Sequence, residues 1–96
     1  MTISDFEKKV IAKKVSKVLD VRIKQSHHTI YNFYHNGKFI LRTYHSHRTG
    51  DLRDFEVQCM KSQLKLDNKQ QLLDLNNCPL SAEGYLEILS RKGLVL

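Results

Sequence analysis

The sequence has no tryptophan, only two cysteines and no long apolar segment, and these absences narrow the range of protein classes. Cys59 and Cys78 are too few for a disulfide framework and lack the C-x-x-C spacing of a zinc site. No stretch approaches the roughly 20 apolar residues of a membrane-spanning helix. Residues 1–5 lead into a charged segment, whereas a signal peptide continues into an apolar core. We therefore expect a soluble cytoplasmic protein with no membrane contact.

Acidic residues are scarce in the first half of the chain. Residues 1–50 hold ten Lys and Arg but three Asp and Glu, whereas residues 51–96 hold six and seven. The segment from Lys24 to Arg48 has no acidic residue and contains all five histidines. This excess of positive charge favours a polyanionic partner, because cationic side chains neutralise phosphates and release their counterions. A basic helix surface in solvent is the alternative explanation.

The spacing of apolar residues predicts a helix followed by three strands. Ser4 and Glu7 have the spacing of a capping box, and the apolar residues after them recur as in a helix from about residue 5 to 18. Alternating, β-branched and aromatic segments predict strands at residues 21–25, 28–35 and 38–45. Asn36 and Gly37 separate the last two strands and are the residues that a tight type I′ turn favours.

The second half of the chain predicts helices only. Asp51 is a suitable N-cap for a helix that continues to about residue 66 and places Cys59 on its apolar side. The remaining signals are a capping-box-like start at Asp67–Gln70 and the cap residues Ser81 and Gly93 of a last helix.

These elements predict an α+β fold in the order α-β-β-β-α, as in double-stranded-RNA-binding domains. We expect a three-stranded antiparallel sheet with the two longer helices packed on one face. The length of 96 residues and the hydrophobic content of 41% predict one domain with a modest core. Within this domain, residues 5–66 form the α-β-β-β-α core and residues 67–96 form a short helical extension.

The hairpin turn sets the expected strand register. A two-residue loop pairs His35 with Lys38, and counting outward then pairs His28 with His45. The same counting assigns one face of the hairpin to His28, Ile30, Asn32, Tyr34, Phe39, Leu41, Thr43 and His45. The corner at residues 26–28 thus lies beside the corner at residues 45–47. A slip of one residue would break the His28–His45 pair but would leave the two corners adjacent.

Imidazoles beside cationic side chains suit the chemistry of a phosphate-bearing partner. Imidazole takes up and releases protons near neutral pH, and Lys or Arg can stabilise charge on phosphate. A transition metal held by the two histidine corners is a further alternative, although no carboxylate or cysteine lies near them in the sequence. The aromatic residues of the strands either stack on bases or pack in the core; they are Tyr31, Phe33, Tyr34 and Tyr44.

Several segments resemble the HicA-type toxins, which are small mRNA-cleaving proteins of bacterial and archaeal toxin–antitoxin pairs. The similar segments are Arg22–His28, His45, Gly50–Leu52 and Met60–Leu64, and the resemblance covers about residues 5–66. It implies an α-β-β-β-α fold, metal-independent cleavage of RNA and an antitoxin protein as a possible partner. It also implies a catalytic imidazole at His27, with the neighbouring His28 as the other candidate.

We therefore predict an RNA-binding protein that needs no metal or cofactor. The predicted RNA-contacting residues are Lys24, Ser26, Arg42, His45, His47 and Arg48. Two departures from the family favour an alternative, a non-catalytic module of the same fold that binds RNA or protein: Gln25 replaces the family's glycine, and residues 67–96 have no counterpart. A third possibility is oligomerisation through the apolar tail at residues 94–96.

Overall fold

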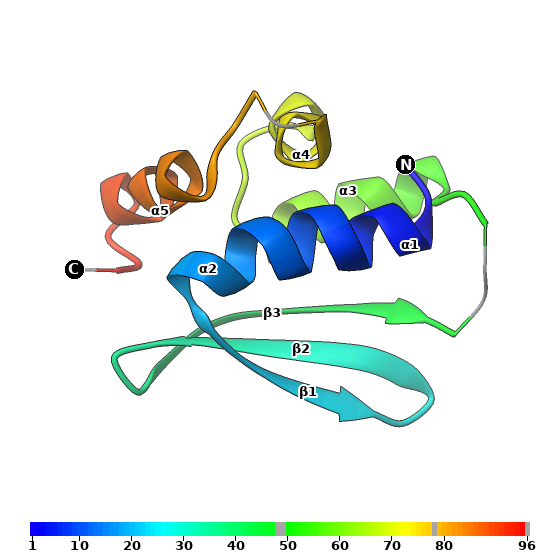
Figure 1. Cartoon of the computed structure of the whole chain (residues 1–96), viewed down its shortest axis with the longest axis horizontal. Helices are drawn as coiled ribbons and strands as arrows, with labels where there is room; N and C mark the ends of the chain where they lie inside the picture. The colour runs from blue at the N-terminus through cyan, green and yellow to red at the C-terminus, as the bar shows by residue number, and fades with distance from the viewer. Residues whose placement is uncertain (48–49, 78, 96) are drawn as a thin grey trace.

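A three-stranded antiparallel sheet forms one side of the molecule, and helices cover one of its two faces (Figure 1). This computed structural model describes residues 1–47, 50–77 and 79–95. The elements are, in order, α1 (Ile3–Asp5), the π-helical segment η1 (Phe6–Val15), α2 (Ser16–Val18), β1 (Asp20–Gln25), β2 (His28–His35), β3 (Lys38–Ser46), α3 (Asp54–Gln63), α4 (Lys69–Asn77) and α5 (Ala82–Arg91). The predicted α+β fold, with its α-β-β-β-α order and C-terminal helical extension, is confirmed.

The first three elements form one continuous N-terminal helix over residues 3–18. Its hydrogen bonds in η1 join residues five apart, so Phe6 and Ile11 lie on the same side of the helix, as do Val10 and Val15. All four side chains are buried. The sheet lies on one side of this helix, and α4 and α5 lie on the other side (Figure 1). Within the described residues, no helix is both long enough and apolar enough to cross a lipid bilayer.

The helix begins earlier than the sequence predicts. The Thr2 hydroxyl accepts a hydrogen bond of 3.0 Å from the Asp5 amide, and the Asp5 carboxylate accepts one of 3.3 Å from the Thr2 amide. The predicted box of Ser4 and Glu7 is therefore wrong by two residues. The reason is that the chain before the helix pairs with residues 50–52, which fixes Thr2 in the extended conformation that an N-cap requires.

The hairpin turn forms as predicted, but the register changes directly after it. Asn36 and Gly37 have positive φ angles of 53° and 81°, and His35 pairs with Lys38. A β-bulge then leaves Ile40 without a partner, so Phe33 pairs with Leu41. All pairs beyond the bulge are shifted by one residue. The predicted His28–His45 pair is therefore wrong, since His28 lies opposite Ser46 and Thr29 lies opposite His45.

The bulge also exchanges the two faces of β3 relative to the prediction. The helix-facing side of the sheet carries Val21, Ile23, Gln25, Thr29, Tyr31, Phe33, Leu41, Thr43 and His45. The opposite side, called the outer face below, carries Asp20, Arg22, Lys24, His28, Ile30, Asn32, Tyr34, Phe39, Arg42, Tyr44 and Ser46. Side chains alternate along a strand, so a one-residue shift moves every following residue of β3 to the other face relative to β2.

Helix α3 differs from the prediction at its start and on its apolar side. Asp51 forms an isolated β-bridge with Thr2 and is not the N-cap; the helix begins at Asp54, where the Arg53 amide donates to the Glu56 carboxylate at 2.9 Å. Met60 is buried, but Cys59 is exposed. The prediction that Cys59 lies on the buried side is therefore wrong. The buried side of the helix instead follows the i, i+3, i+4 spacing of Val57, Met60 and Leu64.

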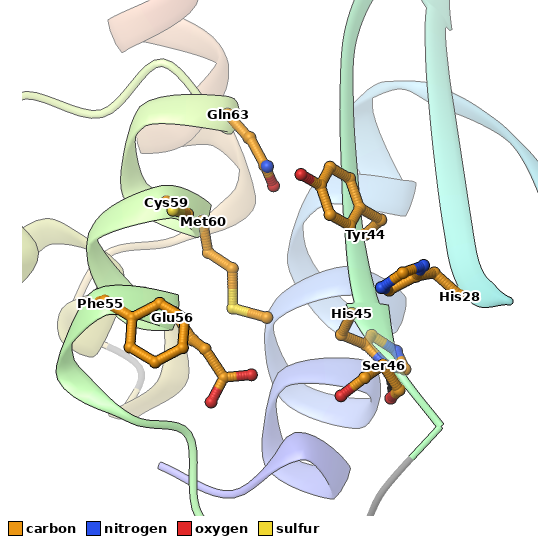
Figure 2. Close-up of a pocket in the computed structure, with 9 residues that line it drawn as sticks. All are labelled: His28, Tyr44, His45, Ser46, Phe55, Glu56, Cys59, Met60 and Gln63. Atoms are coloured by element: carbon orange, nitrogen blue, oxygen red, sulfur yellow. Dashed lines mark hydrogen bonds between the residues drawn. The ribbon is translucent and has the colours of Figure 1, made fainter.

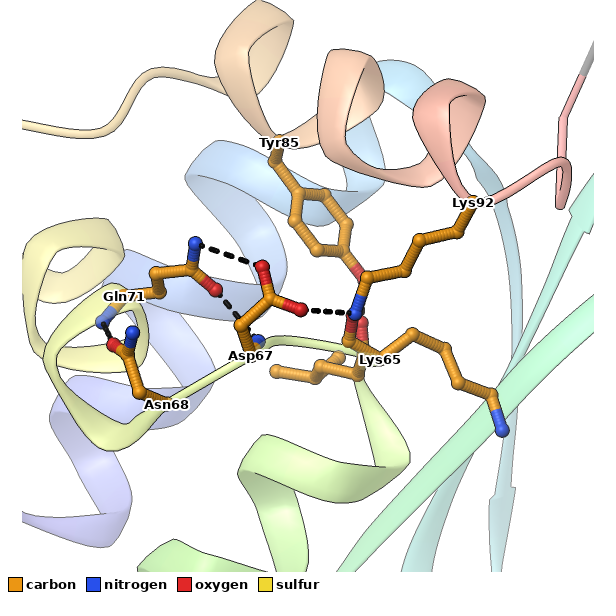
Figure 3. A network of polar contacts seen from close by, with 7 residues as sticks. Lys65, Asp67, Asn68, Gln71, Tyr85 and Lys92 are labelled. Atoms are coloured by element: carbon orange, nitrogen blue, oxygen red, sulfur yellow. Dashed lines mark hydrogen bonds and ion pairs between the residues drawn. The ribbon is translucent and has the colours of Figure 1, made fainter.

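The C-terminal extension is joined to the rest of the core by polar contacts as well as apolar ones (Figure 3). The Tyr85 hydroxyl donates to the Leu64 carbonyl at 2.7 Å. The Lys92 ammonium donates to the Lys65 carbonyl at 2.6 Å and lies 2.8 Å from the Asp67 carboxylate. The hydrogen bond that Lys92 donates to the Asp67 carboxylate, together with its positive charge, lowers the pKa of Asp67. The contacts fix the α3–α4 connection against α5.

The caps of the last two helices are close to those predicted. For α4, the cap is Asn68, whose side chain accepts from the Gln71 amide at 3.0 Å, so the predicted Asp67–Gln70 box is displaced by one residue. For α5, the Ser81 hydroxyl accepts from the Gly84 amide at 3.0 Å, and Gly93 ends the helix with φ of 73°. Both α5 caps are as predicted. Val95 is buried, so this part of the apolar tail packs into the core.

We predict that Tyr85→Phe lowers the free energy of unfolding by about 1 to 3 kcal/mol, because the Leu64 carbonyl loses its buried donor. Urea unfolding followed by circular dichroism measures this change. Tyr44→Phe, at an exposed position, is the control and is expected to change stability by less than about 0.5 kcal/mol. Equal effects of the two substitutions would contradict the structural role of the Tyr85 hydroxyl.

Candidate functional site

The two histidine corners meet at one end of the sheet. Ser26 and His27 form the turn between β1 and β2, where the Ser26 amide donates to the His28 carbonyl at 3.0 Å. Because His28 lies opposite Ser46, the end of β3 runs beside this turn and leads into His47. Ser26, His27, His28 and His47 are all exposed. The predicted meeting of the corners is therefore confirmed, with the register shifted by one residue.

His28 lies on the outer face, and its ring is positioned by an aromatic neighbour. The rings of His28 and Tyr44 are 5.5 Å apart with an interplanar angle of 77°, which is an edge-to-face contact. Both side chains are exposed. The contact keeps the His28 imidazole beside β3 while leaving it accessible to a ligand.

His45 lies on the other face and is 4% exposed. Its Nε2 is 3.0 Å from the Tyr31 hydroxyl and 3.1 Å from a carboxylate oxygen of Glu7, and its Nδ1 is 2.9 Å from the Ser46 carbonyl oxygen. The Phe6 ring packs against the imidazole edge at 6.2 Å. Of the described residues predicted to contact RNA, His45 is thus the one whose side chain is buried.

The partners of His45 determine where its protons are. A carbonyl oxygen only accepts hydrogen bonds, so Nδ1 carries a hydrogen that it donates to Ser46. A neutral ring then accepts from the Tyr31 hydroxyl at Nε2, whereas a protonated ring donates from Nε2 to Glu7. The protonated imidazole thus bonds the sheet to the N-terminal helix, whereas the neutral imidazole bonds within the sheet and meets the helix through the Phe6 ring. Its two nitrogens are used within the protein.

Cationic side chains approach the histidines from the outer face. Lys24 and Arg42, both predicted from the sequence, are exposed there. Sequence reasoning missed Arg22, which lies opposite Asn32 on the same face, with its guanidinium 4.9 Å from the centre of the Tyr34 ring. The alternation of apolar and basic residues along β1 could have predicted this position, because it places Arg22 on the same face as Lys24. Arg48, Cys78 and Leu96, which also entered the sequence predictions, lie outside the described residues.

A small groove of about 180 Å³ lies between α3 and β3 (Figure 2). Phe55, Glu56, Cys59, Met60 and Gln63 line it from the helix, and His28, Tyr44, His45 and Ser46 line it from the sheet. Phe55 is 62% exposed at this groove. The sequence pattern concealed this feature, because Phe55 has the spacing of a core residue.

The structure does not assemble a metal site from the histidine corners. Within residues 1–47, 50–77 and 79–95, no three His, Cys, Asp or Glu side chains are grouped closely enough to hold a metal ion. His45 and His28 lie on opposite faces of the sheet, since His45 is on the helix-facing side.

Comparison of the chain with protein-family models, with curated protein sequences and with solved structures gives no match.

We predict that His45→Ala lowers the free energy of unfolding by about 2 to 4 kcal/mol, because it creates a cavity and removes the ring that joins Tyr31 to Glu7. The exposed His47 is the matched control, and His47→Ala is expected to change stability by less than about 0.5 kcal/mol. Thermal and urea unfolding of the two variants measure the difference. A similar small effect at both positions would be inconsistent with a structural His45.

The raised pKa of Tyr31 leads to a prediction about the stability of the protein at alkaline pH. Burial, assisted by the Glu7 carboxylate, raises the pKa of Tyr31 to about 12, whereas an unfolded chain has a tyrosine pKa of about 10. The folded state thus holds this proton more tightly, and its contribution to stability is complete below pH 10 and is lost as pH rises to 12. We expect this loss to reach about 2 kcal/mol at pH 12.

The measurement is urea unfolding of wild type and Tyr31→Phe at several pH values from 8 to 12. Tyr85, whose pKa burial also raises, contributes equally to both proteins and cancels in the comparison. The stability difference between the two proteins should therefore change above pH 10, with wild type losing more. Parallel curves across this range would show that Tyr31 ionises as in the unfolded chain.

Proposed function

We propose that the protein binds RNA at the end of the sheet where the histidine corners meet, and that it acts in the cytoplasm as a relative of the HicA-type toxins. The observation that carries this proposal is the grouping of exposed polar side chains from separate segments: the Ser26 hydroxyl, the imidazoles of His27, His28 and His47, and the cations Lys24 and Arg42. Residues 21–47 contain no acidic side chain. A phosphate approaching this end therefore meets hydrogen-bond donors and positive charge.

We propose further that this site cleaves RNA without a metal. A 2′-hydroxyl attacks the adjacent phosphorus while one imidazole removes its proton, and a second imidazole protonates the leaving 5′-oxygen. His27 and His28 are the candidates for these two roles, with His47 beside them. Lys24 and Arg42 stabilise the additional negative charge on the phosphorus centre. The products are a 2′,3′-cyclic phosphate and a free 5′-hydroxyl.

The residue in place of the family's glycine is compatible with this corner. Gln25 lies in β1, and the non-glycine residues with positive φ among the described residues are Asn36 and Lys65. The Gln25 side chain accepts a hydrogen bond of 2.9 Å from the Thr29 hydroxyl. The backbone therefore makes this turn without the conformational freedom of glycine, and Gln25 ties the start of β2 to the end of β1.

A second candidate function is RNA binding without cleavage, and the position of His45 favours it. The resemblance offers His45 as an imidazole after the third strand, but its nitrogens contact Glu7, Tyr31 and Ser46. His45 is therefore not available at the surface as a proton donor. The cations and exposed histidines of the corner remain sufficient to bind phosphate.

The test is cleavage of a labelled mRNA by the purified protein in excess EDTA. We expect wild type to cleave, and His27→Ala or His28→Ala to reduce the rate at least about 100-fold, which is typical for loss of a general acid or base. His35→Ala is the matched control, because His35 lies at the opposite end of β2 beside the hairpin turn. Its cleavage rate should equal that of wild type.

Two other outcomes are informative. Intact RNA under all conditions, at a protein concentration that shifts the RNA on a native gel, would exclude cleavage and retain the binding function. Absence of any gel shift at low salt would exclude both functions.

A further inference from the structure

The outer face of the sheet is a separate surface that the helices leave uncovered. The N-terminal helix, α3, α4 and α5 all lie on the other side of the sheet (Figure 1). Helices α4 and α5 of the C-terminal extension pack on the side of the N-terminal helix that faces away from the sheet. Side chains from all three strands therefore meet solvent on this face.

Aromatic side chains occupy the two ends of this face. At one end, Tyr44 is 43% exposed and packs beside His28. At the other end, Phe39 is 51% exposed and makes an edge-to-face contact with Tyr34, with 5.7 Å between the ring centres. Large exposed aromatic groups are costly in water, so two such pairs on one open sheet face indicate a ligand with flat apolar surfaces.

Cationic side chains lie between and beside the aromatic pairs. Arg22, Asn32 and Arg42 form one row across the three strands, and Lys24 lies in the next row with Ile30 and Tyr44. Asp20, at the far end, is the one carboxylate among the strand residues of this face. The ligand must therefore combine flat apolar groups with repeated negative charge.

A shallow hollow on this face is lined by both aromatic and cationic side chains. It has a volume of about 310 Å³ and is lined by His28, Ile30, Arg42 and Tyr44. Its walls thus provide an aromatic ring, an apolar floor and a guanidinium, which are the groups that recognise an unpaired base and its phosphate. His28 belongs both to this hollow and to the histidine corner.

We propose that the outer face binds single-stranded RNA, with bases stacked on Tyr44 and Phe39 and phosphates paired with Arg22 and Arg42. This inference rests on the proposed RNA binding and specifies its substrate class. In a duplex the bases are already stacked on each other and their faces are inaccessible, so exposed aromatic rings offer it little. A single strand can turn its bases onto the sheet and continue past His28 to the exposed imidazoles.

The test compares binding of a single strand of about 12 nucleotides with binding of the duplex of the same sequence. Both are 2′-O-methylated and fluorescently labelled, so that cleavage cannot remove the ligand, and fluorescence anisotropy is measured at one salt concentration. We expect wild type to bind the single strand at least about tenfold more tightly than the duplex. Tyr44→Ala should weaken single-strand binding roughly 5- to 100-fold, as is typical for loss of a stacked base.

Further variants separate the surfaces. Tyr44→Phe keeps the ring and should bind as wild type does, whereas Arg42→Ala should bind more weakly and with a shallower salt dependence. Phe55→Ala removes an exposed ring from the α3 side of the α3–β3 groove, which His28 and Tyr44 also line, and Lys13→Ala removes an exposed charge from the N-terminal helix. Both should change affinity less than about twofold. Melting curves establish that each variant is folded.

The results that would contradict the outer-face site differ from the result that would contradict RNA binding as a whole. Equal affinity for single strand and duplex, unchanged by Tyr44→Ala and Arg42→Ala, would overturn the outer-face site while leaving RNA binding intact. A loss with Phe55→Ala but not with Arg42→Ala would place the RNA in the groove beside α3 and would also overturn it. Absence of binding to either RNA would reject the proposed function itself.

Discussion

The burial of the N-terminal helix on two opposite sides is the constraint on which the rest of the structure depends. Phe6, Val10, Ile11 and Val15 are almost fully removed from water, with the sheet on one side of the helix and α4 and α5 on the other. Burial of an apolar side chain of this size contributes about 1.5 to 3 kcal/mol, so these four residues tie the sheet to the C-terminal helices. All helical elements are thereby stacked on one side of the sheet, and its outer face stays open.

The contact of His45 with Glu7 and Tyr31 divides the five histidines into different roles. His45 is enclosed on the helix-facing side, where one ring connects the helix to two strands. His27, His28 and His47 stay at the surface, although His47 is only two residues from His45. The histidines that cluster in the sequence therefore separate in the fold: His45 stabilises the core, and His27, His28 and His47 remain candidates for the site. The separation arises because β3 ends at Ser46, so His47 lies beyond the strand and outside its alternation of side chains.

Sequence reasoning was most accurate where a local rule fixes the backbone. The bounds of β2, the Asn36–Gly37 turn and the Ser81 and Gly93 caps all follow from short-range preferences, and all are confirmed. It failed where contacts between distant residues determine the strand register. No local signal marks Ile40 as a bulge, since its pairing depends on how both strands fit the helices. The failure had a large effect, because the bulge determines which face carries the candidate site.

The cationic side chains of residues 1–50 also fall into groups with different roles in the fold. Some helix lysines serve the structure, since Lys14 donates to the Leu80 carbonyl at 2.7 Å and Lys9 pairs with Asp5 at 3.5 Å. Others, such as Lys13, are a solvated helix surface of the kind that requires no ligand. The strand cations Arg22 and Arg42 differ because they stand among exposed aromatic rings on a face that no helix covers. Charge alone does not distinguish these groups; the neighbouring aromatic surface does, and this difference is why we propose the outer face of the sheet, and not the helix lysines, as the place where RNA binds.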